Sequence, residues 1–192
     1  MLLYHDGKVS IIFGDETLGC PREFLMENHS QETLLKDAAL QAFRKQVPFE
    51  NLMLLRQCHS AVGFSVTKPL LQTFLKQKHE GDFLVTNCRF LALGVYTADC
   101  LPIILYDAVK QVIGICHAGW VGSLKRVAVA ALEKMMSDYS VHPQDVHIFF
   151  GPAATVCCYE VQESFKEKLQ AFSFHEEVLI QRDNKLFFDM TN

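Results

Sequence analysis

The stretch TADCLPIILYDAVKQVIGICHAGWVG, residues 97–122, decides the predicted fold. It contains two apolar runs rich in Ile, Val and Leu, Leu101–Asp107 and Gln111–His117, and such runs are typical of buried strands. Asp99 and Cys100 precede the first run, and a Cys-His pair ends the second. A cysteine in such a place is often only a small buried hydrophobe. Strand ends in α/β folds, however, are also where ligands gather.

The rest of the chain alternates predicted strands and helices. Runs rich in β-branched and aromatic residues predict strands at Lys8–Phe13, Asp82–Thr86, Phe90–Thr97 and Asp145–Phe150, and two short strands within Asn51–Val66. Apolar residues at helical spacing predict helices at Glu32–Lys45, Leu70–Glu80, from the Ala118–Gly122 turn to about Ser137, and at Gln162–Phe172. A hairpin is predicted around Asp183–Asn184. We therefore expect one α/β (α+β) domain over residues 1–192, with a mixed β-sheet core flanked by helices.

Composition excludes several classes of protein. Of the 192 residues, 49% are hydrophobic and 21% are charged, which is ordinary for a globular chain. The net charge of -4 and the lack of a Lys/Arg-rich run argue against nucleic-acid partners. No apolar run reaches the roughly 18 residues of a membrane helix, and the start of the chain does not resemble a signal peptide. We expect a cytoplasmic protein without membrane partners, whose seven cysteines are mostly reduced; its oligomeric state is left open.

Three candidate metal ligands stand at predicted strand ends: His59, Cys100 and His117. A Cys/His/His set suits a catalytic zinc ion, which takes three protein ligands and keeps a fourth position open. Copper accepts the same ligand types, but three ligands cannot build several copper centres, so Zn²⁺ is the expected cofactor. Alternatively, Cys100 and His117 form the nucleophilic pair of a cysteine hydrolase or deamidase. The composition does not separate these hypotheses. Cys116 alternates with His117 and is predicted to face the core.

Four motifs carry a resemblance to a known family: QCHS (57–60), TADCLP (97–102), HAGWVG (117–122) and GPAATVCCYEV (151–161). In this order, over about Asn51 to Met190, they resemble the YfiH-like purine nucleoside phosphorylase family, also labelled multicopper polyphenol oxidase or laccase-domain proteins. The resemblance implies a zinc site at His59, Cys100 and His117. It also implies a fold similar to the catalytic domain of cytotoxic necrotizing factor toxins, which are Cys-His deamidases.

The resemblance further implies nucleoside chemistry: phosphorolysis of adenosine, inosine or methylthioadenosine, and adenosine deamination, with a purine nucleoside and phosphate as partners. Cys100 and His117 are then expected to be catalytic residues as well as metal ligands. Asp99 is a candidate general acid/base, or else a residue that caps its turn. The backbone N–H groups after Gly119 are candidates to hold phosphate at the start of a helix.

Candidate substrate-binding residues lie in or beside the motifs. Gln57 would orient the base or only bond to its neighbours, and Trp120 would line the pocket or belong to the core. Tyr159 and Glu160 are candidates to contact the ribose hydroxyls. Cys157 and Cys158 are assigned to packing, because adjacent cysteines cannot easily face one metal.

The sequence also departs from the family pattern. Val121 replaces the motif Arg, the Asn-Arg pair of the first helix is missing near Asp37, and Ser60 replaces a glycine. The chain stops at Asn192 without the family's usual C-terminal segment, as expected of a shortened member or of a fragment. The lost cations bear on phosphate, whereas the zinc ligands are intact. A binding module that keeps the metal for structure is therefore a third hypothesis.

Overall fold

The structure is a computed structural model that describes residues 2–5, 7–14, 41, 44–45, 47–77, 79–170, 172 and 177–190. The helix expected at Glu32–Lys45 lies largely outside the described residues, as does Asp37; Gln41, Arg44 and Lys45 are helical.

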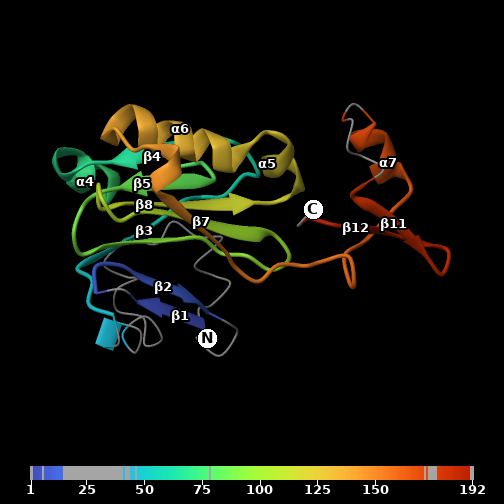
Figure 1. The fold of residues 1–192 in the computed structure, drawn as a ribbon, viewed down its shortest axis with the longest axis horizontal. Coiled ribbons are helices and arrows are strands. Elements are labelled where there is room, and N and C mark those ends of the chain that lie inside the picture. Colours follow the sequence, from blue (N-terminus) through green and yellow to red (C-terminus); the bar gives the residue numbers. More distant parts are fainter. Residues whose placement is uncertain are drawn as a thin grey trace.

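A five-stranded sheet in the order β4-β5-β8-β7-β9 forms the centre of the molecule (Figure 1). Its strands are β4 (Gly63–Val66), β5 (Phe83–Thr86), β7 (Leu101–Asp107), β8 (Val112–Ala118) and β9 (Val146–Phe150). β4 and β5 are parallel and the other pairs are antiparallel, so the sheet is mixed. This confirms the predicted mixed α/β architecture.

The two apolar runs of the opening stretch form the hairpin β7–β8, in which Leu101 pairs with Ala118 and Asp107 with Val112. Every residue of β7 is buried. At the turn, one carboxylate oxygen of Asp107 accepts hydrogen bonds from the backbone N–H groups of Val109 and Lys110, at 2.7 and 2.9 Å. This side chain ends β7 and reverses the chain, because an Asp can hydrogen-bond the backbone two residues on.

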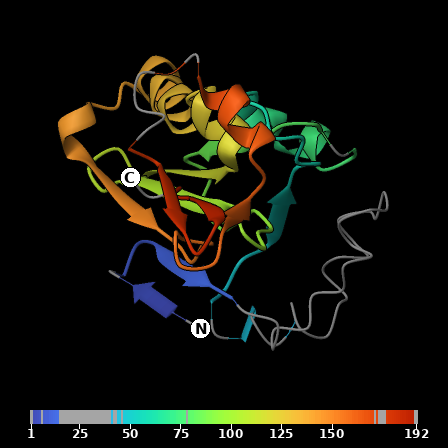
Figure 2. The ribbon, with the colours of Figure 1, turned by 90° about the vertical axis from the view of Figure 1, so that its right-hand side faces the viewer.

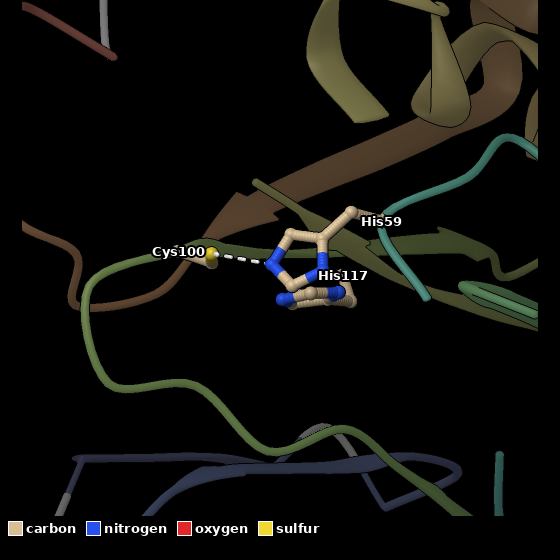
Figure 3. Close-up of side chains that lie close together, drawn as sticks. All are labelled: His59, Cys100 and His117. Carbon is tan, nitrogen blue, oxygen red and sulfur yellow. Dashed lines mark hydrogen bonds between the residues drawn. The ribbon is translucent and has the colours of Figure 1, made fainter. Parts of the chain in front are cut away.

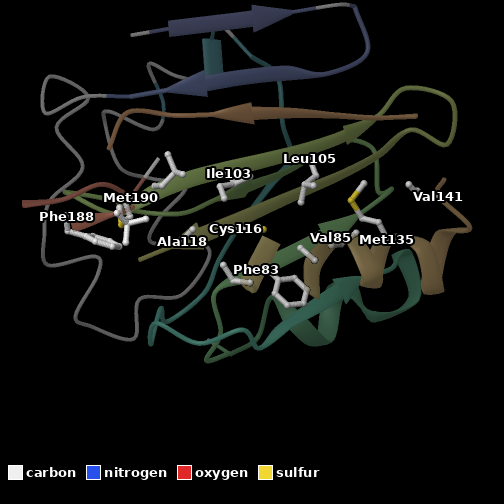
Figure 4. Packing of buried hydrophobic residues seen from close by; sticks show 14 of the residues in the cluster. Phe83, Val85, Ile103, Leu105, Cys116, Ala118, Met135, Val141, Phe188 and Met190 are labelled. Atoms are coloured by element: carbon white, nitrogen blue, oxygen red, sulfur yellow. The ribbon is translucent and has the colours of Figure 1, made fainter. Parts of the chain in front are cut away.

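Two helices cover one face of the sheet, α5 (Trp120–Leu124) and α6 (Val127–Tyr139). A single helix was expected here, but Arg126 adopts the left-handed conformation (φ 62°, ψ 45°) and interrupts it. The break redirects the chain, so that α6 begins with Val127 and buries a regular face, Val127, Ala131 and Met135, at i, i+4 and i+8. Figure 4 shows Met135 beside Val85 and Leu105 of the sheet. Cys116 is fully buried, which confirms its assignment to the core.

Smaller units surround this core (Figures 1 and 2). The strands β3 (Asn51–Leu54) and β6 (Leu91–Gly94) pair in parallel, and β1 (Leu2–His5) pairs with β2 (Ser10–Phe13). The helix expected at Leu70–Glu80 is α4 (Lys68–Phe74). Near the C-terminal end are β10 (Glu160–Val161), α7 (Ser164–Leu169), β11 (Leu179–Arg182) and β12 (Lys185–Phe188). Asp183 and Asn184 join β11 to β12 with φ of 51° and 59°, as a two-residue hairpin turn requires.

Candidate metal centre

The three predicted ligands lie together at one end of the central sheet (Figure 3). Cys100 directly precedes β7, and His117 lies near the end of β8 opposite Pro102, so the hairpin register brings both to the same edge. His59 arrives from the loop that joins β3 to β4. This convergence was predicted from the motif residues, and it depends on strand pairing that no local pattern specifies.

The distances within the cluster suit a shared metal ion. The candidate ligand atoms all lie within 4.8 Å of one another, and Sγ of Cys100 is 3.8 Å from Nε2 of His59. The rings of His59 and His117 meet edge to face, with centroids 4.8 Å apart. Ligand atoms that share one tetrahedral zinc ion lie roughly 3.5 Å apart, because each is about 2.0–2.3 Å from the metal. The cluster can therefore hold a metal ion after small side-chain movements.

Asp82, which directly precedes β5, lies beside His117 and was not among the predicted site residues. Its side chain is fully buried, and its Oδ1 is 2.8 Å from Nδ1 of His117. Although burial alone would raise the pKa of Asp82, hydrogen bonds from His117 and Ser60 lower it to about 2. An ionised carboxylate only accepts hydrogen bonds, so Nδ1 of His117 carries the proton and Nε2 offers a lone pair. That is the tautomer in which a histidine binds a metal through Nε2.

Burial within the cluster increases from His59, which is exposed, through Cys100 to His117, which is 3% exposed. Burial raises the pKa of the Cys100 thiol, and the nearby carboxylates Asp99 and Asp82 raise it further. Burial also lowers the pKa of His117, although its hydrogen bond to Asp82 opposes this. Without a metal, the thiol therefore stays protonated near neutral pH. This disfavours a free Cys100 nucleophile, whereas a bound cation would stabilise the thiolate.

Gly119 allows the cluster to close. It directly precedes α5 in an extended conformation (φ −75°, ψ 168°) that any residue can adopt. A Cβ atom at this position would lie 2.7 Å from Cδ2 of His59 and 2.9 Å from Sγ of Cys100. The motif glycine is therefore needed here for space beside the candidate ligands, and not for an unusual backbone conformation.

Two further candidates of the sequence lie beside the cluster. Asp99 is exposed, and its carbonyl accepts a hydrogen bond from the backbone N–H of Ala154 at 2.9 Å. The ring of Tyr159 packs against Phe188. Burial raises the pKa of Tyr159, with smaller contributions from Cys100 and Asp99. Asp99 and Tyr159 thus lie within electrostatic reach of Cys100, and their roles in proton transfer and substrate binding remain predictions.

The other three predicted substrate-binding residues have protein partners. Both ends of the Gln57 amide form hydrogen bonds with the backbone of Tyr96, each at 2.8 Å. This agrees with the alternative that Gln57 only bonds to its neighbours. Trp120 is half-buried and packs against Phe165 of α7, with ring centroids 5.0 Å apart. Glu160 is exposed and pairs with Lys185 at 2.7 Å. Their roles in substrate binding remain predictions.

Cys157 and Cys158 do not pack in the core, which corrects the sequence assignment. Both are exposed on the turn that precedes β10. The Sγ atom of Cys157 lies 3.1 Å from the hydroxyl of Thr155, and this contact lowers the pKa of the thiol. Arg182 holds the turn by donating a hydrogen bond to the carbonyl of Cys157 at 3.2 Å. Adjacency in the sequence excluded only a metal shared by the two cysteines, and the tight turn directs both side chains outward.

A groove of about 440 Å³ lies on the helix-covered face of the sheet, next to this end. Its wall includes Leu101 and Ala118, which follow the ligands Cys100 and His117 in sequence, together with Phe150 and Met190. Arg126, from the break between α5 and α6, is the one cation among its lining residues in the described part of the chain. Val121, where the family motif has Arg, is half-buried in α5.

Comparison with known proteins identifies the family. Residues 27–192 match the family described as multi-copper polyphenol oxidoreductase laccase. The chain is 35% identical over 147 residues to a purine nucleoside phosphorylase of Borreliella burgdorferi, an alignment that covers 73% of this chain and 60% of that protein. The chain belongs to the YfiH-type purine nucleoside phosphorylase family. The resemblance seen in the four motifs is thereby confirmed.

Other members of the YfiH-type family add to this comparison. The adenosine deaminase RL5, from an unknown prokaryotic organism, is 28% identical over 146 residues, which cover 74% of this chain and 55% of that protein. The crystal structures of Bacillus licheniformis YfiH and Geobacillus stearothermophilus YlmD share the fold, each with a TM-score of 0.66, at 21% and 24% identity. Each match covers 79% of this chain and 60% of the other. The chain thus spans about 60% of the length of these relatives. None of its described helices is long and apolar enough to cross a membrane.

Proposed function

We propose that this chain is a zinc-dependent purine nucleoside enzyme, which catalyses phosphorolysis of adenosine, inosine or methylthioadenosine and deamination of adenosine. The observation that carries the proposal is the convergence of His59, Cys100 and His117 within 4.8 Å. The named relatives supply the substrate class, since they include purine nucleoside phosphorylases and an adenosine deaminase.

The residues of the site would divide the work as follows. His59, Cys100 and His117 would hold zinc, which supplies Lewis-acid chemistry when bound. Asp99 and Tyr159, the ionisable neighbours of Cys100, are the candidates to move a proton to or from the substrate. His59, the exposed ligand, marks the side from which a nucleoside would approach.

Phosphorolysis needs an anion site as well, and here this chain differs from the family motif. Val121 offers no charge, and α5, with five residues, has only a small dipole at its start. Lys125 and Arg126 are exposed at the junction of α5 and α6, and are the nearest cations along the chain. Deamination requires no phosphate, so it does not depend on the charge that Val121 lacks.

Product analysis by mass spectrometry tests the proposal. Zinc-loaded protein is incubated with adenosine, with and without phosphate, and His117→Ala serves as the control. Inosine in both incubations would establish deamination, and free adenine with ribose 1-phosphate only in the presence of phosphate would establish phosphorolysis. Val121→Arg should increase phosphorolysis if the missing charge limits it. The absence of any product would refute the nucleoside-enzyme hypothesis and would favour first a cysteine hydrolase and then a binding module that keeps its metal for structure.

A second candidate function is a cysteine hydrolase or deamidase, as in the toxin domains that the sequence resemblance implies. One observation favours it: Cys100 lies within 4.8 Å of His117, whose ring is hydrogen-bonded to the Asp82 carboxylate as a general base is to its orienting carboxylate. The raised pKa of Cys100 opposes it. This candidate predicts activity that persists in metal-free protein and disappears on alkylation of Cys100.

A further inference from the structure

We propose that Asp82 is the positioning residue of the metal centre, whose single carboxylate sets both the orientation of His117 and the backbone path that delivers His59. The inference rests on the metal site of the proposed function but not on the reaction that the site catalyses. We base it on the hydrogen bonds that converge on the Asp82 carboxylate.

Three consecutive backbone N–H groups point at the Asp82 carboxylate. The N–H groups of Cys58 and His59 lie 3.2 and 3.0 Å from Oδ1, and the N–H of Ser60 lies 2.6 Å from Oδ2. The hydroxyl of Ser60 also donates to Oδ2, at 2.6 Å. Successive N–H groups that surround one anion form the concave arrangement called a nest. Here the anion is the buried side chain of the residue that directly precedes β5, more than twenty residues away in the sequence.

The loop needs this anion because His59 has a left-handed backbone conformation, with φ of 57°. Such a conformation is unfavourable for a residue with a Cβ atom and persists only where the surroundings hold it. It is also what turns the loop so that the ring of His59 faces Cys100 and His117 (Figure 3). β3 and β4 belong to different sheets, and the loop between them is also held by the Gln57 amide and by a backbone hydrogen bond of Val62. The Asp82 carboxylate adds the connection from this loop to His117 at the end of β8.

The same oxygen that accepts from His59 also accepts from Nδ1 of His117, at 2.8 Å. One atom thereby ties the backbone of one ligand to the ring of another. Ser60 and Cys58 complete the set of donors, so the carboxylate has partners on both oxygens. A change at Asp82 should therefore disturb two of the three ligands together, although Asp82 does not itself belong to the ligand set.

Asp82→Asn is the sharpest test, because it keeps the size of the side chain. Whichever way the amide turns, its NH₂ group meets at least one backbone N–H that now has no acceptor. We expect the dissociation constant for zinc to rise about 10–100-fold, as it does when a residue that hydrogen-bonds to a metal ligand is removed. Ser60→Ala, which keeps the backbone N–H, should cause a smaller loss. Asp107→Asn is the matched control: Asp107 is equally buried and accepts two backbone N–H groups, but at the other end of β7.

The readouts do not depend on catalysis. Zinc affinity is measured by competition with a chromogenic chelator, and ligand geometry by the absorption spectrum of the Co²⁺-substituted protein, with unfolding of the metal-free forms followed in parallel. Weaker binding and an altered spectrum in Asp82→Asn, but not in Asp107→Asn, would support the proposal. Unchanged affinity and spectrum in Asp82→Asn, or equal losses in both variants, would overturn it. If the wild-type protein itself binds no zinc, the metal part of the proposed function fails instead.

Discussion

Replacing Gly119 with Ala should damage the metal centre while leaving the fold intact. The new methyl group would lie 2.7 Å from Cδ2 of His59 and 2.9 Å from Sγ of Cys100. Carbon atoms in ordinary contact are about 3.5–4.0 Å apart, so the His59 ring must move by roughly 1 Å. Metal–ligand distances tolerate changes of only about 0.2 Å. We therefore expect zinc affinity to fall about 10–100-fold, which is the range observed when a residue that supports a metal ligand is lost.

Gly114→Ala provides the control for this substitution. Gly114 lies in β8, the same strand as His117, and its added Cβ would be 3.4 Å from the side chains of Leu105 and Met135, which is ordinary contact. Zinc affinity should be unchanged in that variant. Ala in place of Gly119, just before a helix, should cost at most about 1 kcal/mol of stability.

Chelator competition gives the zinc affinity of both variants, and thermal unfolding of the metal-free proteins shows whether each has folded. If Gly119→Ala folds and binds zinc as tightly as the wild type, with an unchanged Co²⁺ spectrum, then the close approach of His59 and Cys100 to Gly119 does not describe the metal-bound state. Steric space beside His59 and Cys100 would then not explain the glycine at position 119.

Three further predictions address the ligands, the buried carboxylate and the thiols. His117→Ala should abolish zinc binding, measured as metal content after gel filtration; full occupancy would exclude His117 as a ligand. In the folded protein the pKa of Asp82 is about 2, below its usual value. Its contribution to the free energy of unfolding is therefore present above about pH 4 and is lost as the pH falls towards 2. Urea unfolding of the metal-free protein should reveal this loss, and Asp82→Asn should remove that part of the pH dependence. Iodoacetamide should modify exposed Cys157 first, since the Thr155 hydroxyl lowers its pKa, and buried Cys116 last. Early labelling of Cys116, seen by peptide mass spectrometry, would contradict its packing.

Local sequence accounts for most of the secondary structure near the site. The two apolar runs after Cys100 became β7 and β8 because branched apolar residues suit a buried sheet. Alternation placed Cys116 in the core and turned the side chain of His117 to the opposite face of β8, and Asp183–Asn184 formed the expected hairpin turn. The helix after the motif glycine was predicted as one piece, because no local signal marks Arg126 as a left-handed residue.

The amino-acid sequence alone identifies the residues that can bind a metal: His59, Cys100 and His117 stand in motifs that identify the family and suit a soft-to-borderline metal. The tertiary structure brings these residues together, because the register of β7 on β8 and the path of the 58–60 loop depend on long-range contacts. It also decided the role of Asp82, whose sequence signal was no more than an acid ahead of a buried strand. A buried carboxylate is stable only where donors surround it, and these donors come from the distant segments that the fold brings to it.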